Sequence, residues 1–156
     1  MGFATHLGPW LLGTVKNTTG TVPGTIRNMG ATEVVQTASL GFADGTTALF
    51  TLPAGALVTS FQLLTTTGYA GGTTPTITLK NGSTVLTSGL TNPAAAGFSN
   101  FTVATTGVPF CANIGTTDAT VSATLAGTCT SGASTVIVHY IVRDTNGNAN
   151  PTAFQQ

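Results

Sequence analysis

Apolar side chains alternate with threonine and serine over most of the chain between residues 31 and 144. This period of two is typical of strands that bury one face of an antiparallel sheet. No stretch has the spacing of apolar residues that an amphipathic helix requires. The pattern predicts eight strands, at residues 32–40, 46–52, 57–65, 76–80, 83–88, 98–105, 119–125 and 134–144.

Three of these segments also predict which side chains face the core. Residues 119–125 alternate most regularly, with the odd-numbered positions inward. Residues 134–144 form the most apolar run in the chain, which predicts a central strand buried on both sides. Residues 57–65 carry Val58 and Leu64 on the face opposite the core, so a second central strand is expected there. The inward positions of that segment by alternation are Leu57, Phe61 and Leu63.

Turn residues separate the strands. Asn81-Gly82 predicts a two-residue hairpin turn, because both residues tolerate the positive φ that a type I′ turn needs. Asp44-Gly45 predicts another turn, and Pro53-Ala54-Gly55 a sharp corner. The glycine-rich residues 68–72 are expected to form a loop, and Pro109 places residues 108–111 at an edge or in a loop.

Eight antiparallel strands in ~120 residues predict an all-β domain, a two-sheet sandwich of jelly-roll type. An immunoglobulin-like sandwich stays open as the alternative, because the pattern does not order the strands. The expected organisation is an extended N-terminal arm at residues 1–30, the β-sandwich at residues 31–144 and an irregular C-terminal tail at residues 145–156.

The N-terminal arm combines two opposed features. Glycine and proline interrupt every period in it, yet it carries a compact apolar group: Phe3, Trp10, Leu11 and Leu12. Such a group is expected to dock, either on its own sandwich or in a neighbouring subunit, where a large aromatic side chain fills a pocket. The predicted partner-binding residues are therefore these four.

The composition is unusually poor in charge. Only 5% of residues are charged and the net charge is zero, while threonine, with 34 residues, supplies the polarity. A neutral surface fits either a protein that spends its life against neighbouring subunits or an exposed extracellular β-domain. It excludes a basic patch of the kind that nucleic acid or an anionic membrane would need. No apolar run reaches the ~20 residues of a membrane-spanning helix, and the N-terminus is not typical of a signal peptide.

Candidate chemistry is sparse. His139 lies within a strand and is expected to be a half-buried structural residue, and His6 lies in the arm. Cys111 and Cys129 either pair or act as small buried hydrophobes. The acids form no local pair and the cysteines and histidines lack ligand spacing, so we expect no enzyme, no metal, no cofactor and no small-molecule substrate.

A resemblance enters through two stretches that cover about half the chain. The run FTLPAGALVTS at residues 50–60, followed by LLTTT and TITLKNG, resembles small virion proteins of tailed bacteriophages. The N-terminal THLGPWLLGTVKN, with residues 25–30, is similar to the start of short structural proteins of marine phages, including cyanophages. The resemblance implies a capsid decoration or cement protein on the capsid surface. Its implied partners are the major capsid protein and neighbouring copies of itself, in a homo-oligomer.

Two other virion roles remain open. A receptor- or glycan-binding module of a phage tail or fibre would use a loop contact, with Tyr69 as a stacking platform for a sugar ring. A neck or tail-adaptor subunit would form a ring instead of a coat. Neither role calls on a catalytic residue.

Overall fold

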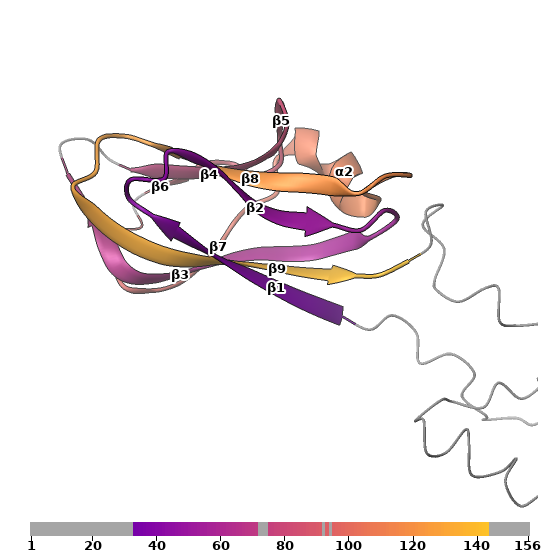
Figure 1. The fold of residues 1–156 in the computed structure, drawn as a ribbon, viewed down its shortest axis with the longest axis horizontal. Helices are drawn as coiled ribbons and strands as arrows, with labels where there is room; N and C mark the ends of the chain where they lie inside the picture. Colours follow the sequence, from indigo (N-terminus) through magenta and orange to yellow (C-terminus); the bar gives the residue numbers. More distant parts are fainter. Residues whose placement is uncertain (1–32, 72–74, 92, 94, 144–156) are drawn as a thin grey trace, which may run out of the picture.

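The computed structural model describes residues 33–71, 75–91, 93 and 95–143. These residues form two stacked antiparallel sheets with one short helix at one end (Figure 1). The elements are β1 Glu33–Gly41, β2 Thr46–Leu52, β3 Leu57–Ala70, β4 Thr76–Asn81, β5 Thr84–Val85, β6 Leu90–Thr91, β7 Gly97–Asn100, the 3₁₀ turn η1 Thr105–Gly107, α2 Val108–Ala112, β8 Ala119–Ala126 and β9 Ser131–Ile141.

The strand order confirms the jelly roll. The first sheet has the order β1-β9-β3-β7, and the second has the order β2-β8-β4-β5, with β6 also paired to β4. The pairs nest within one another along the sequence: β1 with β9, β2 with β8, β3 with β7 and β4 with β5. Nested antiparallel pairs describe one long double-stranded ribbon that curls into two sheets, which is the jelly-roll topology and not the immunoglobulin one.

The expected count of eight strands holds because β5 and β6 are two parts of one interrupted strand. Both pair antiparallel with β4, but the register moves by two residues between them. The backbone N–H groups of Leu86 and Thr87 both point to the carbonyl of Leu79, at 2.9 and 3.4 Å. The buried Thr87 hydroxyl accepts a hydrogen bond from the Leu79 N–H at 3.0 Å, so a side chain replaces the missing ladder contact.

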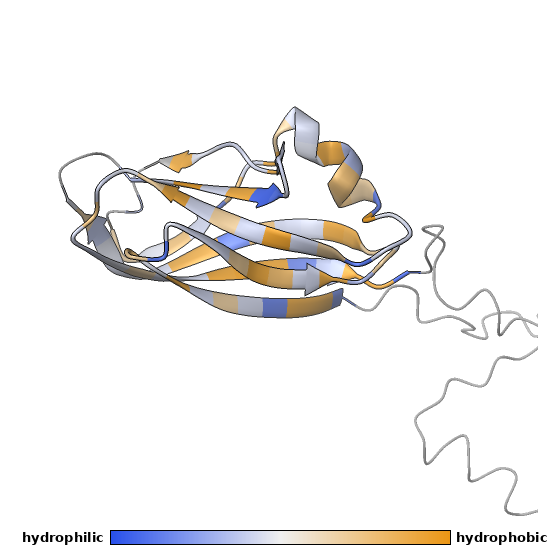
Figure 2. Ribbon diagram, turned by 45° about the horizontal axis from the view of Figure 1, so that its top comes forward, coloured by the Kyte–Doolittle hydropathy of each residue, from blue (hydrophilic) through white to orange (hydrophobic). Residues whose placement is uncertain are grey.

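The core lies between the sheets and follows the predicted alternation. Hydrophobic and hydrophilic bands alternate along the strands (Figure 2). In β8, Val121, Ala123 and Leu125 are buried, as expected. In β9 the prediction was partly wrong: the strand is central, but only one face is fully buried, at Gly132, Ser134, Val136, Val138 and Tyr140.

A β-bulge corrects the inward assignment of β3. The register of β3 against β9 shifts between Val58 and Ser60, which inserts one residue and reverses the faces on its N-terminal side. Val58 is therefore buried and Leu57 is only half-buried, opposite to the expectation, whereas Phe61 and Leu63 are inward as predicted.

Two turns and one helix also differ from expectation. Asn81 pairs with Thr84, so Gly82 and Ser83 are the central residues of the hairpin, one position later than predicted; Gly82 has φ 54°. Residues 108–111 belong to α2, because Pro109 is accommodated in the first helical turn, where no N–H is needed. Residues 68–70 continue strand β3 and are not a loop.

Candidate functional site

The predicted contact residues of the arm, Phe3, Trp10, Leu11 and Leu12, lie outside the described residues. The boundaries proposed for the arm at residues 1–30 and for the tail at residues 145–156 also stay predictions. The sandwich itself therefore provides the geometry on which a site can be built.

The structure corrects the role proposed for Tyr69. Its side chain is 2% exposed and lies in β3, between the sheets. The phenol donates a hydrogen bond to the Leu40 carbonyl at 2.8 Å and lies 2.8 Å from the Ser134 hydroxyl. Burial raises the pKa of Tyr69 above its ordinary value. A buried ring cannot stack on a sugar, so Tyr69 is a core residue with its hydroxyl satisfied.

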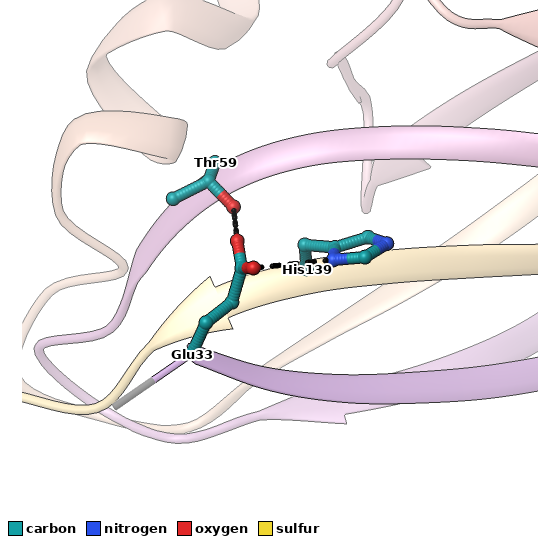
Figure 3. A network of polar contacts seen from close by, with 3 residues as sticks. All are labelled: Glu33, Thr59 and His139. Carbon is teal, nitrogen blue, oxygen red and sulfur yellow. Dashed lines mark hydrogen bonds and ion pairs between the residues drawn. The ribbon is translucent and has the colours of Figure 1, made fainter. Parts of the chain in front are cut away.

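Three polar side chains meet on the outer surface of the first sheet (Figure 3). The Thr59 hydroxyl donates to Glu33 Oε1 at 2.6 Å, and His139 Nδ1 lies 3.5 Å from Glu33 Oε2. The hydrogen bond from Thr59 lowers the pKa of Glu33, and His139 contributes to the same shift. The carboxylate lies between the hydroxyl and the imidazole. An activated nucleophile needs the imidazole in that middle position, so this geometry links three strands and does not build a catalytic triad.

The thiols show no reactive arrangement. Cys111 and Cys129 are both free, so the disulfide that the sequence left open does not form in this structure. Burial raises the pKa of Cys111 to about 11, which keeps its thiol protonated at neutral pH. Among the described residues, no group of three or more His, Cys, Asp or Glu side chains could hold a metal ion. No helix in the described part is long and apolar enough to cross a membrane.

Three further charged side chains hold the ends of the sandwich together. Turn formation was the expected role of Asp44, and its contact with the Gly41 N–H confirms it, whereas Asp118 reaches the corner at residues 53–55, far away in sequence. The contacts are Gly41 N–H to Asp44 Oδ2 at 2.6 Å, Ala54 N–H to Asp118 Oδ1 at 2.9 Å, and the Arg143 guanidinium to the carbonyls of Gly55, at 3.0 Å, and Ala112.

The outer surface of the first sheet carries a set of apolar side chains that we call the apolar face. Direct cross-strand partners share a face, so the register places these residues together. Phe98 is 71% exposed and Val35 is 51% exposed, and the other members are half-buried. The apolar face consists of Val35, Leu57, Leu64, Phe98, Ile137 and Ile141.

The outer surface of the second sheet is different, and we call it the threonine face. Thr46, Thr124 and Thr78 form one row across three strands, and the Thr46 hydroxyl lies 3.4 Å from that of Thr124. Among the described strands that form the threonine face, Lys80 is the one charged residue. The threonine face consists of Thr46, Thr51, Thr78, Thr120, Ser122 and Thr124.

Sequence reasoning did not single out the apolar face, although part of its signal was present. In the strand predicted at residues 98–105, Phe98 has the opposite parity to the buried Phe101, which places it on the outer surface. Leu64 was assigned to the outer face but was interpreted only as a sign of a central strand. Leu57 could not be found by parity, because the bulge in β3 reverses its face.

No protein-family model matches the chain, and no curated protein matches its sequence. Solved structures do match. A chain in the acid-stable capsid of Helicobacter pylori bacteriophage KHP30 has a TM-score of 0.54 at 16% identity, over 73% of this chain and 90% of that one. A chain in the capsid of Ralstonia phage GP4 has a TM-score of 0.52 at 17% identity, over 80% and 94%. A chain in the capsid asymmetric unit of cyanophage Pam1 has a TM-score of 0.46 at 19% identity, over 82% and 98%.

The KHP30 and GP4 likenesses show the fold. They place the same jelly-roll architecture in chains of two phage capsids, in which fewer than one residue in five is identical to this chain. The resemblance to phage virion proteins that the sequence indicated is confirmed at that level.

Proposed function

We propose that this chain is a structural protein of a bacteriophage virion, and that it decorates and cements the head. In this role it binds the lattice of the major capsid protein on the capsid surface, next to further copies of itself. The observation that carries the proposal is the shared jelly roll with chains of two phage capsids, at TM-scores of 0.54 and 0.52.

The extent of the likeness supports a decoration role. The matched region takes up 90% and 94% of the two capsid chains, which are therefore small proteins built almost entirely from this sandwich. A small sandwich of this kind is suited to be an accessory subunit, because it adds to a shell without having to close one.

The surface chemistry supports the same role. Charged residues make up 5% of the chain, and five of them, Glu33, Asp44, Lys80, Asp118 and Arg143, lie in the described sandwich or its turns. Burying a neutral surface against a neighbour avoids the cost of removing water from charges. Many modest contacts, repeated over a lattice, stabilise the assembled shell by mass action.

The structure removes the residue-level support for a tail or fibre function. A glycan-binding module was proposed with Tyr69 as its stacking platform, and the ring of Tyr69 is buried. Nothing in the described geometry favours a neck or tail-adaptor ring over a coat, so the capsid role is the one we carry forward.

Binding to empty heads tests the proposal. Purified protein is incubated with expanded and with unexpanded empty heads of its own phage, and bound copies are counted by sedimentation and quantitative gel. We expect saturable binding at a fixed ratio to the major capsid protein, and the preferred head form will show when the protein joins. Absence of binding to both forms would overturn the capsid role and move the search to the tail.

A further inference from the structure

The two outer surfaces of the sandwich differ in chemistry, and this difference orients the molecule. The threonine face presents hydroxyl groups in cross-strand rows, whereas the apolar face exposes Phe98 and Val35 beside four half-buried aliphatic side chains. Exposed Phe on a flat sheet is costly in water and favourable against protein. We infer that the sandwich lies on the capsid lattice through its apolar face, with the threonine face toward solvent. This inference rests on the proposed function.

The apolar residues recur on all four strands of the sheet, with polar residues between some of them. Phe98 on β7 lies directly opposite Leu64 on β3 in the register. Leu64 lies diagonal to Ile137 on β9, and Ile137 lies diagonal to Val35 on β1, at separations that long side chains bridge. The surface therefore crosses all four strands, from one edge of the sheet to the other, and can be covered by a single flat partner.

The charge of this surface specifies the chemistry of the partner. Glu33 is the one acidic residue on the described strands of the first sheet, and Thr59 and His139 already contact its carboxylate. A strongly basic partner would find no anionic surface here, and a strongly acidic one no cationic surface. The partner that fits is a weakly charged protein surface.

The course of the chain indicates the lattice and not a second copy as that partner. Thirty-two residues precede Glu33, the first residue of β1, and Glu33 pairs with Ile141 at the end of β9. The start of β1 and the end of β9 therefore lie side by side at one end of the first sheet, at the border of the apolar face. If the predicted partner-binding residues of the preceding segment, Trp10 among them, hold the lattice, the apolar face is carried to the same partner at high effective concentration.

The small area of the face explains why its binding depends on attachment through another part of the chain. Strands of 9, 11, 14 and 4 residues, ~4.8 Å apart and rising ~3.3 Å per residue, cover roughly 600 Å². A stable interface buries about 800 Å² on each partner. The face alone is thus a weak site, and its contribution depends on attachment elsewhere and on repetition over the shell.

Matched double variants test the orientation. Val35→Glu with Phe98→Glu adds two carboxylates to the apolar face, and Thr46→Glu with Thr120→Glu adds two to the threonine face. All four positions are exposed, so both variants are expected to fold, which thermal unfolding monitored by circular dichroism checks. We expect the first variant to weaken binding to empty heads by about tenfold or more, because its charges are desolvated on docking. The second variant is expected to bind like the wild type, within about twofold.

Each other outcome is informative. A folded Val35→Glu, Phe98→Glu variant that binds heads like the wild type would overturn the inference, and so would a loss of binding confined to the threonine-face variant. Sedimentation velocity supplies the second measurement: if the wild type is oligomeric and the apolar-face variant is a monomer, the face joins copies of this chain and the lattice assignment is wrong. If the wild type itself does not bind heads, it is the proposed function that fails.

Discussion

At the scale of single residues, Tyr69 shows how a glycine shapes the core. Gly132 on β9 has φ 144°, and a Cβ added there would lie 2.3 Å from a ring carbon of Tyr69. The space that the ring occupies therefore exists only because residue 132 has no side chain. The hydroxyl of the same ring reaches the Leu40 carbonyl, so one residue ties β3 to β1 and requires a gap in β9.

The substitution Gly132→Ala is expected to lower the free energy of unfolding by about 2–4 kcal/mol, through overpacking and backbone strain. Urea denaturation monitored by far-ultraviolet circular dichroism measures this change in unfolding free energy. The control is Gly82→Asn in the hairpin, where φ is 54° and no atom lies within 4 Å of an added Cβ. Equal stability of Gly132→Ala and wild type would contradict this account of the Tyr69 pocket.

The Glu33 contacts predict a pH dependence with a definite sign. The folded-state pKa of Glu33 lies below its ordinary value of 4.5, so its contribution is present above pH 4.5 and is lost as pH falls through the folded-state pKa. Wild type should therefore exceed Glu33→Gln in unfolding free energy at neutral pH, and the difference should shrink below pH 4.5. Urea titrations at several pH values measure both curves. A difference that is constant down to pH 3 would show that Glu33 does not act through its charge.

At the scale of elements, the interrupted strand β5–β6 depends on one hydroxyl. Thr87 is fully buried, and its Oγ1 is the acceptor for the N–H of Leu79 on β4. Thr87→Val keeps the shape but leaves that buried N–H without an acceptor, which costs about 1–3 kcal/mol of unfolding free energy. Thr78→Val, on the threonine face, is the matched control and should change stability by less than about 0.5 kcal/mol. Thermal and urea unfolding compare the two, and equal effects would place the cost in the substitution and not in the hydrogen bond.

Prediction from sequence succeeded for elements that alternate and failed where the backbone departs from regular pleating. The odd-numbered residues of β8 were assigned to the core because nothing interrupts that strand. The bulge in β3 is invisible to parity, so Leu57 and Val58 were exchanged. Glycines near Tyr69 indicated a loop, but Gly68 continues the strand. The apolar face required the strand order, because Phe98, Ile137 and Val35 become neighbours only through pairing of distant segments.

At the scale of the whole molecule, attachment to the head is proposed to depend on the segment before β1. Trp10→Ala is expected to abolish binding to empty heads, because a large aromatic anchor typically carries much of an interface's energy. The sandwich of the variant should unfold at the temperature of the wild type, since the core lies within residues 40–140. Sedimentation with heads and a thermal melt measure the two properties. Normal binding by Trp10→Ala would remove the arm from the proposed function.

The nested pairing of the strands has a consequence for biosynthesis. In the first sheet, β9 lies between β1 and β3 and pairs with both of them, although it is the last strand in chain order. Without β9, β1 and β3 are not joined. A nascent chain on the ribosome therefore lacks the centre of that sheet until residues 131–141 have emerged. Contacts this distant in sequence form late and slowly. A translation product that stops before β9 would lack the strand that joins the two halves of the apolar face, so an incomplete copy would keep only the N-terminal arm for attachment to a shell.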